Sequence, residues 1–171
     1  MQKKSEGGRR AQAVVAGLLD VFAGTERVIS GRVNDPSRRY PGDVLVCAPG
    51  EPPVREKAFE VRDKPVTETD VRIFARRCME KEVSEVAVVM VSLAQKPLDT
   101  ASLRAWASEY GIGLSLFHGW PELVDQILIW ASIPQFEGAV AAAAFIGTRL
   151  REIEVAPESL VEWYSLLKVE P

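Results

Sequence analysis

The spacing of apolar residues changes along the chain, and this change predicts the order of its secondary-structure elements. Apolar positions 14, 15, 18, 19 and 22 have helical spacing, which predicts a helix over 8–23 that ends at Gly24. Short alternating or β-branched runs between turn residues predict strands at 26–33, 43–48, 54–64, 85–93 and 112–118. Further helical patterns cover 68–82, 98–110, 122–133, 136–150 and 157–168.

The connections between these elements predict how the strands pair. The first three strands are joined by short turns, so we expect them to be antiparallel, whereas helices separate the later strands and predict parallel pairing. The sequence therefore predicts an α/β fold, with a mixed central β-sheet flanked by helices on both faces. We expect a single domain over 1–171, with a core at about 8–134 and a helical C-terminal part at about 135–171.

Composition narrows the class of protein. The chain has 171 residues, of which 47% are hydrophobic and 26% charged, as is typical of a globular domain. No apolar stretch is long enough to span a membrane, and the basic N-terminus leads into no signal-peptide core. We therefore expect a cytoplasmic protein with no membrane partner.

The cysteines, the histidine and the net charge disfavour several chemistries. Cys47 and Cys78 lack zinc-ligand spacing and stand in apolar stretches, so we interpret both as core residues. His118 is the only histidine, which disfavours hydrolases built on histidine. The net charge of −3 disfavours general affinity for nucleic acid, but basic residues cluster at the N-terminus, at 38–39 and at 72–77. Solvated surface charge is the alternative interpretation of these clusters.

One pair of acidic residues is a candidate site. Asp43 follows a Pro-Gly turn at the start of one predicted strand, and Glu60 lies near the end of the next. If these strands pair, the two carboxylates meet at one end of the sheet, where a divalent cation would offset their repulsion. Residues 60, 62 and 64 share a face if the strand continues to Pro65, so Arg62 and Lys64 are candidate catalytic cations. Alternatively, Asp43 caps a turn and Glu60 belongs to a charged surface ladder.

The stretch from PGDVLV to FEVRDK resembles the PD-(D/E)xK nuclease motif, in which an Asp after a turn, a second acidic residue and a Lys two positions later form the active site. The closer resemblance is to type II restriction endonucleases of the SacI family. It is carried by GGRRAQA at 7–13, GRVNDPSRRYPGDV at 31–44 and AFEVRDKPVTETD at 58–70. It extends more loosely to SLAQKP at 92–97 and FHGWPELVDQIL at 117–128. Members of that family are longer at the N-terminus, so we expect this chain to correspond to the catalytic portion.

The resemblance implies a function and a cofactor. It implies a restriction-endonuclease-like fold and Mg²⁺-dependent hydrolysis of double-stranded DNA at a specific, palindromic site, with Mn²⁺ as a substitute and a homodimer acting on the DNA. Asp43 and Glu60 would be the metal ligands, and Arg38 and Arg39 are candidate DNA contacts. The sequence departs from the motif at its lysine position, which is Arg62.

An arginine remains charged and cannot act as a base, so we favour Lys64 as the catalytic cation and Arg62 as a clamp on phosphate or carboxylate. The alternative functions are a non-catalytic DNA-binding module with a degenerate nuclease fold and a DNA-repair nuclease. For three further residues a structural interpretation is favoured over a functional one: an exposed glutamine for Gln12, a satisfied loop histidine for His118 and a tryptophan at the rim of the core for Trp120. Gln95 either reaches the active site or starts a loop, and both interpretations stay open.

Overall fold

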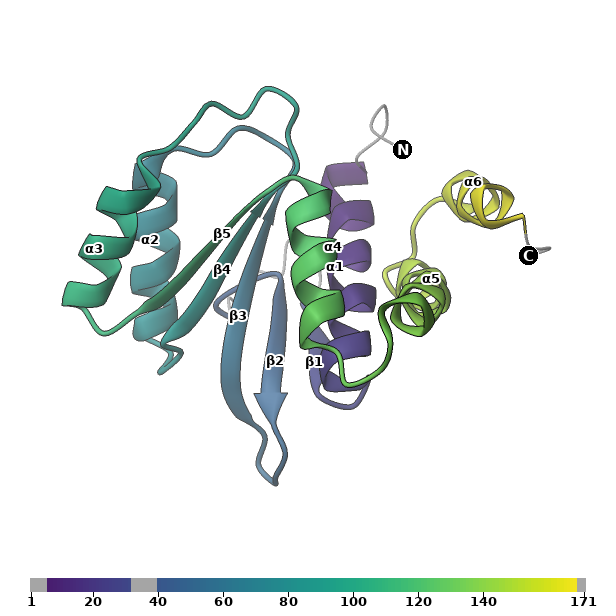
Figure 1. Cartoon of the computed structure of the whole chain (residues 1–171), viewed down its shortest axis with the longest axis horizontal. Coiled ribbons are helices and arrows are strands. Elements are labelled where there is room, and N and C mark those ends of the chain that lie inside the picture. The colour runs from purple at the N-terminus through teal and green to yellow at the C-terminus, as the bar shows by residue number, and fades with distance from the viewer. Residues whose placement is uncertain (1–5, 32–39, 169–171) are drawn as a thin grey trace.

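The computed structural model describes residues 6–31 and 40–168 (Figure 1). Its helices are α1 (Arg9–Ala23), α2 (Glu68–Met79), α3 (Thr100–Glu109), α4 (Trp120–Trp130), α5 (Gln135–Glu152) and α6 (Pro157–Leu167), after a short 3-10 turn at Glu6–Gly8. Its strands are β1 (Val28–Ser30), β2 (Val44–Ala48), β3 (Val54–Arg62), β4 (Glu85–Met90) and β5 (Gly113–His118). The predicted order of helices and strands is confirmed.

The five strands form one mixed sheet in the order β1-β2-β3-β4-β5. Strands β1, β2 and β3 pair antiparallel, and β3, β4 and β5 pair parallel, as the lengths of their connections predict. Because helices α2 and α3 complete the parallel crossovers, the carboxyl ends of β3, β4 and β5 lie along one edge of the sheet (Figure 1). The predicted mixed α/β fold is confirmed.

Strand β3 ends earlier than the sequence pattern predicts. Arg62 is its last residue, and the Arg62 carbonyl accepts the final backbone hydrogen bond from Val91, at 2.9 Å. Asp63 and Lys64 form a bend ahead of Pro65. A proline has no backbone N–H and restricts the residue before it, so the chain leaves the sheet before reaching it. The expectation of one unbroken strand over 54–64 is therefore wrong, and strand alternation does not extend from Glu60 to Lys64.

Helices cover both faces of the sheet, and each face has its own core (Figure 1). Phe59 and Val61 pack toward α1 and α4, while Ala58 packs toward α2 and α3. Since strand side chains alternate, Glu60 shares the face of Ala58 and therefore faces α2. Cys47 and Cys78 are buried and form no disulfide, which confirms their interpretation as core residues.

The C-terminal helices pack closely on α1. A Cβ atom on Gly17 would lie 2.5 Å from the backbone nitrogen of Ile146, so only glycine permits this approach of α1 to α5. Beside this contact, Arg149 forms a buried ion pair with Asp20, with an N–O distance of 2.6 Å. The alanine-rich stretch thus belongs to a packed helix, as its composition indicates, and α5 helps to fix α1 against the sheet.

Helices α4 and α5 meet at a sharp bend of 116°. Among residues 6–31 and 40–168, no single helix is long and apolar enough to cross a membrane, and only this bent pair meets the length and composition criteria when taken together. Helix α4 begins at Trp120, two residues before the predicted start, because Gly119 and Pro121 suit a helix N-terminus.

Candidate active site

The structure brings Asp43 and Glu60 to opposing positions on neighbouring strands. Val44 pairs with Phe59, and the backbone N–H of Asp43 donates to the Phe59 carbonyl at 2.9 Å, which sets Asp43 opposite Glu60. A Cβ atom on Gly42 would lie 2.7 Å from that same carbonyl oxygen, so glycine is needed immediately before Asp43. The predicted Pro-Gly turn therefore delivers one carboxylate beside the other.

Glu60 is an acidic side chain with almost no access to water. It is 6% exposed, and its two oxygens bind different cations: Oε1 accepts from Arg62, and Oε2 accepts from Arg77 at 3.0 Å. Burial and, after it, the nearby charge of Asp43 raise the pKa of Glu60, the two arginines lower it, and the net result is a pKa of about 7. The effects of burial and of Asp43 on this pKa thus outweigh those of the two arginines. A further positive charge at the site would therefore stabilise the ionised form of Glu60.

Asp43 has a similar electrostatic environment. Burial raises the pKa of Asp43, against the lowering effects of the Val61 hydrogen bond and of the charges on Arg62 and Arg77. Its Oδ2 accepts from the backbone N–H of Val61 at 2.8 Å. This bond fixes the carboxylate in a defined orientation at the end of the β2–β3 pair. Two acids with raised pKa values in direct electrostatic contact are typical of functional sites.

Arg77 is a site residue that the sequence analysis assigned only to a basic cluster. Its Nε donates to the Pro41 carbonyl at 3.0 Å while its terminal nitrogen holds Glu60, so it joins helix α2 to both acidic strands. A capping box between Thr67 and Asp70 fixes the start of that helix. The sequence signal for Arg77 is limited to helical periodicity: it is three residues after the buried Phe74 and so borders the apolar face of α2, but this spacing does not identify its partner.

The other two arginines of that cluster have a different environment. The guanidinium groups of Arg72 and Arg76 lie 5.2 and 5.7 Å from the ring centroid of Trp106, so both extend over an aromatic side chain of α3. The cluster at 72–77 therefore divides into two arginines at the α2–α3 surface and one at the acidic pair.

Lys64 lies on the exposed bend after β3 and makes no hydrogen bond or ion pair with another described residue. The segment that follows it is held by Gln95, whose side chain accepts from the Val66 N–H at 2.8 Å and donates to the Val66 carbonyl at 3.0 Å. Gln95 is thus more than a loop-starting residue, because it fixes the chain two positions after Lys64. Arg38 and Arg39 lie outside the described residues.

Gln12 is buried, so its interpretation as an exposed glutamine is wrong. It is 2% exposed, and its Nε2 donates to the carbonyls of Gly31 and Asp43 at 2.6 and 2.7 Å. Its Oε1 has no hydrogen-bond partner within the described residues. Helix α1 therefore supports the main chain at Asp43 directly, because Gln12 donates to the Gly31 carbonyl and is a second donor, beside the Gly31 N–H, to the Asp43 carbonyl.

The donor atoms fit a hard divalent cation. Within residues 6–31 and 40–168, no cluster of three or more His, Cys, Asp or Glu side chains is arranged to hold a metal, so the candidate ligands are a carboxylate pair. Mg²⁺ commonly uses one or two protein carboxylates and keeps several waters. Each carboxylate oxygen has two lone pairs, so Glu60 can contact an arginine and a cation at once.

The fold and the acidic pair define an α/β protein with the sheet topology expected of a restriction-endonuclease-like core. Residues 1–91, which contain the pair and its arginines, match the model of the SacI restriction endonuclease C-terminal domain. The chain belongs to that family. It is also 27% identical, over 157 residues, to the type II restriction enzyme SacI of Streptomyces achromogenes. That alignment covers 91% of this chain and 42% of the enzyme, so the chain spans less than half the length of this relative.

The contact between Arg77 and Glu60 leads to a prediction about pH. Removal of Arg77 takes away a cation that lowers the pKa of Glu60, so the proton is bound more tightly. In the variant Arg77→Ala, the titration profile of the Glu60 carboxyl, followed by NMR, is expected to move to higher pH. Arg76→Ala is the matched control, because Arg76 is the next residue on α2 and lies over Trp106. Equal profiles for the two variants would contradict the assigned contact.

Proposed function

We propose that this chain is a Mg²⁺-dependent nuclease domain of the PD-(D/E)xK type that hydrolyses phosphodiester bonds in double-stranded DNA. The observation that carries the proposal is the opposition of Asp43 and Glu60, two acids with raised pKa values, at the end of a strand pair. Family membership supports a nuclease, and the position of the acids supports metal-assisted chemistry.

Asp43 and Glu60 are the residues that would hold Mg²⁺, with Mn²⁺ as a substitute. When bound, such an ion polarises a phosphate oxygen and lowers the pKa of a water molecule. Two features of the site favour its binding. The backbone N–H of Val61 orients the Asp43 carboxylate, and the arginines keep Glu60 partly ionised near neutral pH. A cation at this position would offset the charge of Asp43, which after burial is the second cause of the raised pKa of Glu60.

The basic residues around the pair would act on the DNA backbone. Arg62 is half exposed beside Glu60, so its remaining donors can contact a phosphate as well as the carboxylate. Lys64, exposed and without a protein partner in the described chain, can approach the scissile phosphate and offset charge that develops on its oxygens. This division of roles makes Lys64 the catalytic cation and Arg62 a clamp.

Specific cleavage of a palindromic site would require two copies of the domain. A twofold-symmetric target presents each strand to an equivalent active site, which favours a homodimer on DNA. The name of the relative, a type II restriction enzyme, supports the same form of activity for this chain.

A second candidate function is a DNA-binding module that has lost catalysis. The observation that favours it is the occupation of both Glu60 oxygens by arginine, together with Arg62 at the position where the motif has lysine. In such a module the arginines would replace the metal and the domain would bind DNA without cutting it.

Incubation of the purified chain with plasmid DNA distinguishes the two functions. The nuclease is expected to convert supercoiled plasmid to defined fragments with Mg²⁺ or Mn²⁺, and to stop when EDTA is added, because the carboxylates then hold no Lewis acid. Mapping of the fragment ends identifies the site. Binding of duplex DNA without cleavage in either metal would favour the non-catalytic module, and cleavage in EDTA would contradict the metal mechanism.

A further inference from the structure

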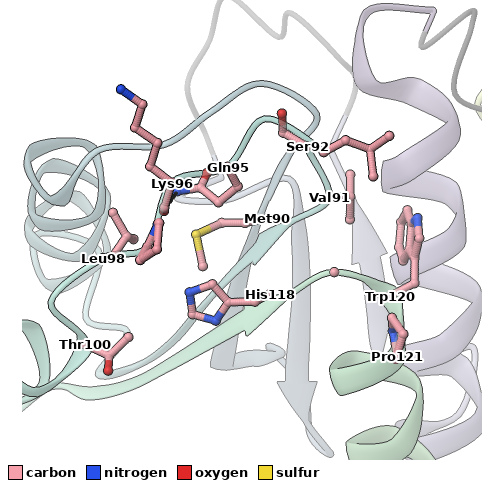
Figure 2. Close-up of a pocket in the computed structure, with 13 residues that line it drawn as sticks. Met90, Val91, Ser92, Gln95, Lys96, Leu98, Thr100, His118, Trp120 and Pro121 are labelled. Atoms are coloured by element: carbon pink, nitrogen blue, oxygen red, sulfur yellow. Dashed lines mark hydrogen bonds between the residues drawn. The ribbon is translucent and has the colours of Figure 1, made fainter.

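A pocket of about 710 Å³ opens at the carboxyl ends of β4 and β5. It lies between the loop that leads from β4 to α3 and the turn that leads from β5 to α4 (Figure 2). The Met90 side chain and the His118 ring lie close together within it, with Leu98 on one side and Trp120 and Pro121 on the other (Figure 2). None of the residues placed at the acidic pair lines this pocket.

The strand register relates the pocket to the acidic pair. Arg62 pairs with Met90, and Met90 pairs with His118, so these three residues occupy the same level on three adjacent parallel strands. Paired residues on parallel strands point to one face, so the pocket and Glu60 share both a face and an edge of the sheet. Neighbouring strands are about 4.8 Å apart, which puts the His118 backbone roughly 10 Å from that of Arg62. The pocket therefore lies within two strands of Glu60 at the same end of the sheet.

The walls of the pocket suit a flat heteroaromatic ring. Met90, Leu98, Trp120 and Pro121 supply apolar surface, and polar atoms come from a few side chains that include His118 and Thr100. The Lys96 ammonium points away from Met90 and His118, so the pocket does not concentrate positive charge as a phosphate site would (Figure 2). Apolar walls with a small number of hydrogen-bonding groups are typical of pockets that hold a ring with polar edges, and the volume lies in the range of small-molecule pockets.

We propose that this pocket receives one nucleobase of the substrate DNA, turned out of the double helix next to the cleaved phosphodiester bond. The proposal rests on the proposed nuclease function. His118 then contacts the edge of the base, and the apolar side chains contact its faces. An extruded base can be read by shape and by its Watson–Crick edge, so the pocket contributes to the choice of site.

Gln95 connects this pocket to the proposed catalytic segment. It lines the pocket and holds both backbone groups of Val66, two residues after Lys64. A second contact joins the same two loops, because the Asp99 N–H donates to Glu68 at 3.2 Å. A base in the pocket therefore lies against the loop that fixes the Lys64 segment, which links recognition of the base to the position of that lysine.

Fluorescence of 2-aminopurine tests the proposal, since this base becomes brighter when it leaves the stack. Duplexes carry it at successive positions on both sides of the mapped cut, and Ca²⁺ replaces Mg²⁺ to permit binding without cleavage. The wild-type chain is expected to raise the fluorescence at one position only. His118→Ala and Leu98→Trp, which remove a polar contact and fill the pocket, are expected to abolish that rise and to weaken DNA binding by about tenfold or more.

Val161→Trp is the matched control, because it adds the same bulk at an exposed position on α6 and is expected to behave as wild type. If Leu98→Trp fails to fold, His118→Ala still decides the outcome, since its ring is at the protein surface. A chain that cuts DNA but raises the fluorescence at no position overturns the pocket proposal and leaves the nuclease function intact. A chain that neither binds nor cuts DNA overturns both.

Discussion

Asp43→Asn and Glu60→Gln are each expected to lower the rate of Mg²⁺-dependent DNA cleavage by about a thousandfold or more, with the fold intact. Either change removes a carboxylate from the proposed metal site, and Lewis-acid stabilisation of a phosphoryl transition state contributes several kcal/mol. Single-turnover kinetics with excess protein measures the rate, and circular dichroism checks the fold. Glu109→Gln is the matched control, because this glutamate is exposed at the end of α3.

The same glutamine variant is expected to be more stable than the wild type at alkaline pH. The folded state raises the pKa of Glu60 from 4.5 to about 7, so it binds more protons than the unfolded state between these values. Stability conferred by Glu60 is therefore complete below about pH 4.5 and falls as the pH rises through about 7. At pH above this window, Glu60→Gln avoids the buried charge and is expected to gain stability on the order of 2 kcal/mol.

Thermal unfolding in EDTA across this pH range measures the difference. The gain in stability is expected to disappear near the acid end, where the wild-type carboxyl is also neutral. In the cleavage assay, a folded Glu60→Gln protein that cuts DNA at a near wild-type rate would show that the active site lies elsewhere. A variant less stable than wild type at high pH would mean that the arginine contacts outweigh the desolvation of Glu60.

Lys64→Ala is expected to lower the single-turnover cleavage rate by about a hundredfold, roughly the contribution of one electrostatic stabiliser, with little loss of DNA affinity. Arg62→Ala is expected to weaken DNA binding at least as much as it lowers the rate, because Arg62 both holds Glu60 and presents donors to solvent. Lys81→Ala serves as the control for the loss of an exposed lysine.

The single-turnover cleavage rate at saturating protein distinguishes the catalytic role of Lys64 from the DNA-binding role of Arg62. If Lys64→Ala cuts DNA normally under these conditions while Arg62→Ala does not, Arg62 is the catalytic cation and the motif ends at that residue. The early end of β3 makes this outcome informative, since Lys64 lies on a bend and not at a strand position that shares the face of Glu60.

The sequence is sufficient to predict that Asp43 lies opposite Glu60, because the strands that carry them and the pairing of these strands follow from local patterns. A Pro-Gly turn fixes the start of β2, alternation identifies β3, and a short connection makes the pair antiparallel. The sheet order follows from the same reasoning, since helical connections impose parallel pairing on β3, β4 and β5.

The contacts of Arg77 and Gln12 were not predictable in the same way, because each joins elements that are distant in sequence. Arg77 is 17 residues from Glu60, and Gln12 is 31 residues from Asp43. A polar residue beside an apolar helical face has the same pattern whether it meets solvent or a buried carboxylate. Only the packing of α1 and α2 against the strand ends decides between these outcomes.

Asp43 and Glu60 are proposed to hold one divalent cation together, and the position of that cation can be measured directly. Fe²⁺ with ascorbate generates radicals that cut a polypeptide next to the bound metal, and mass spectrometry locates the cuts. The predicted result is cleavage of the chain within a few residues of Asp43 and Glu60, suppressed by excess Mg²⁺ and lost in Asp43→Asn. Cuts elsewhere in the chain, or the same cuts in the folded Asp43→Asn variant, would contradict the claim.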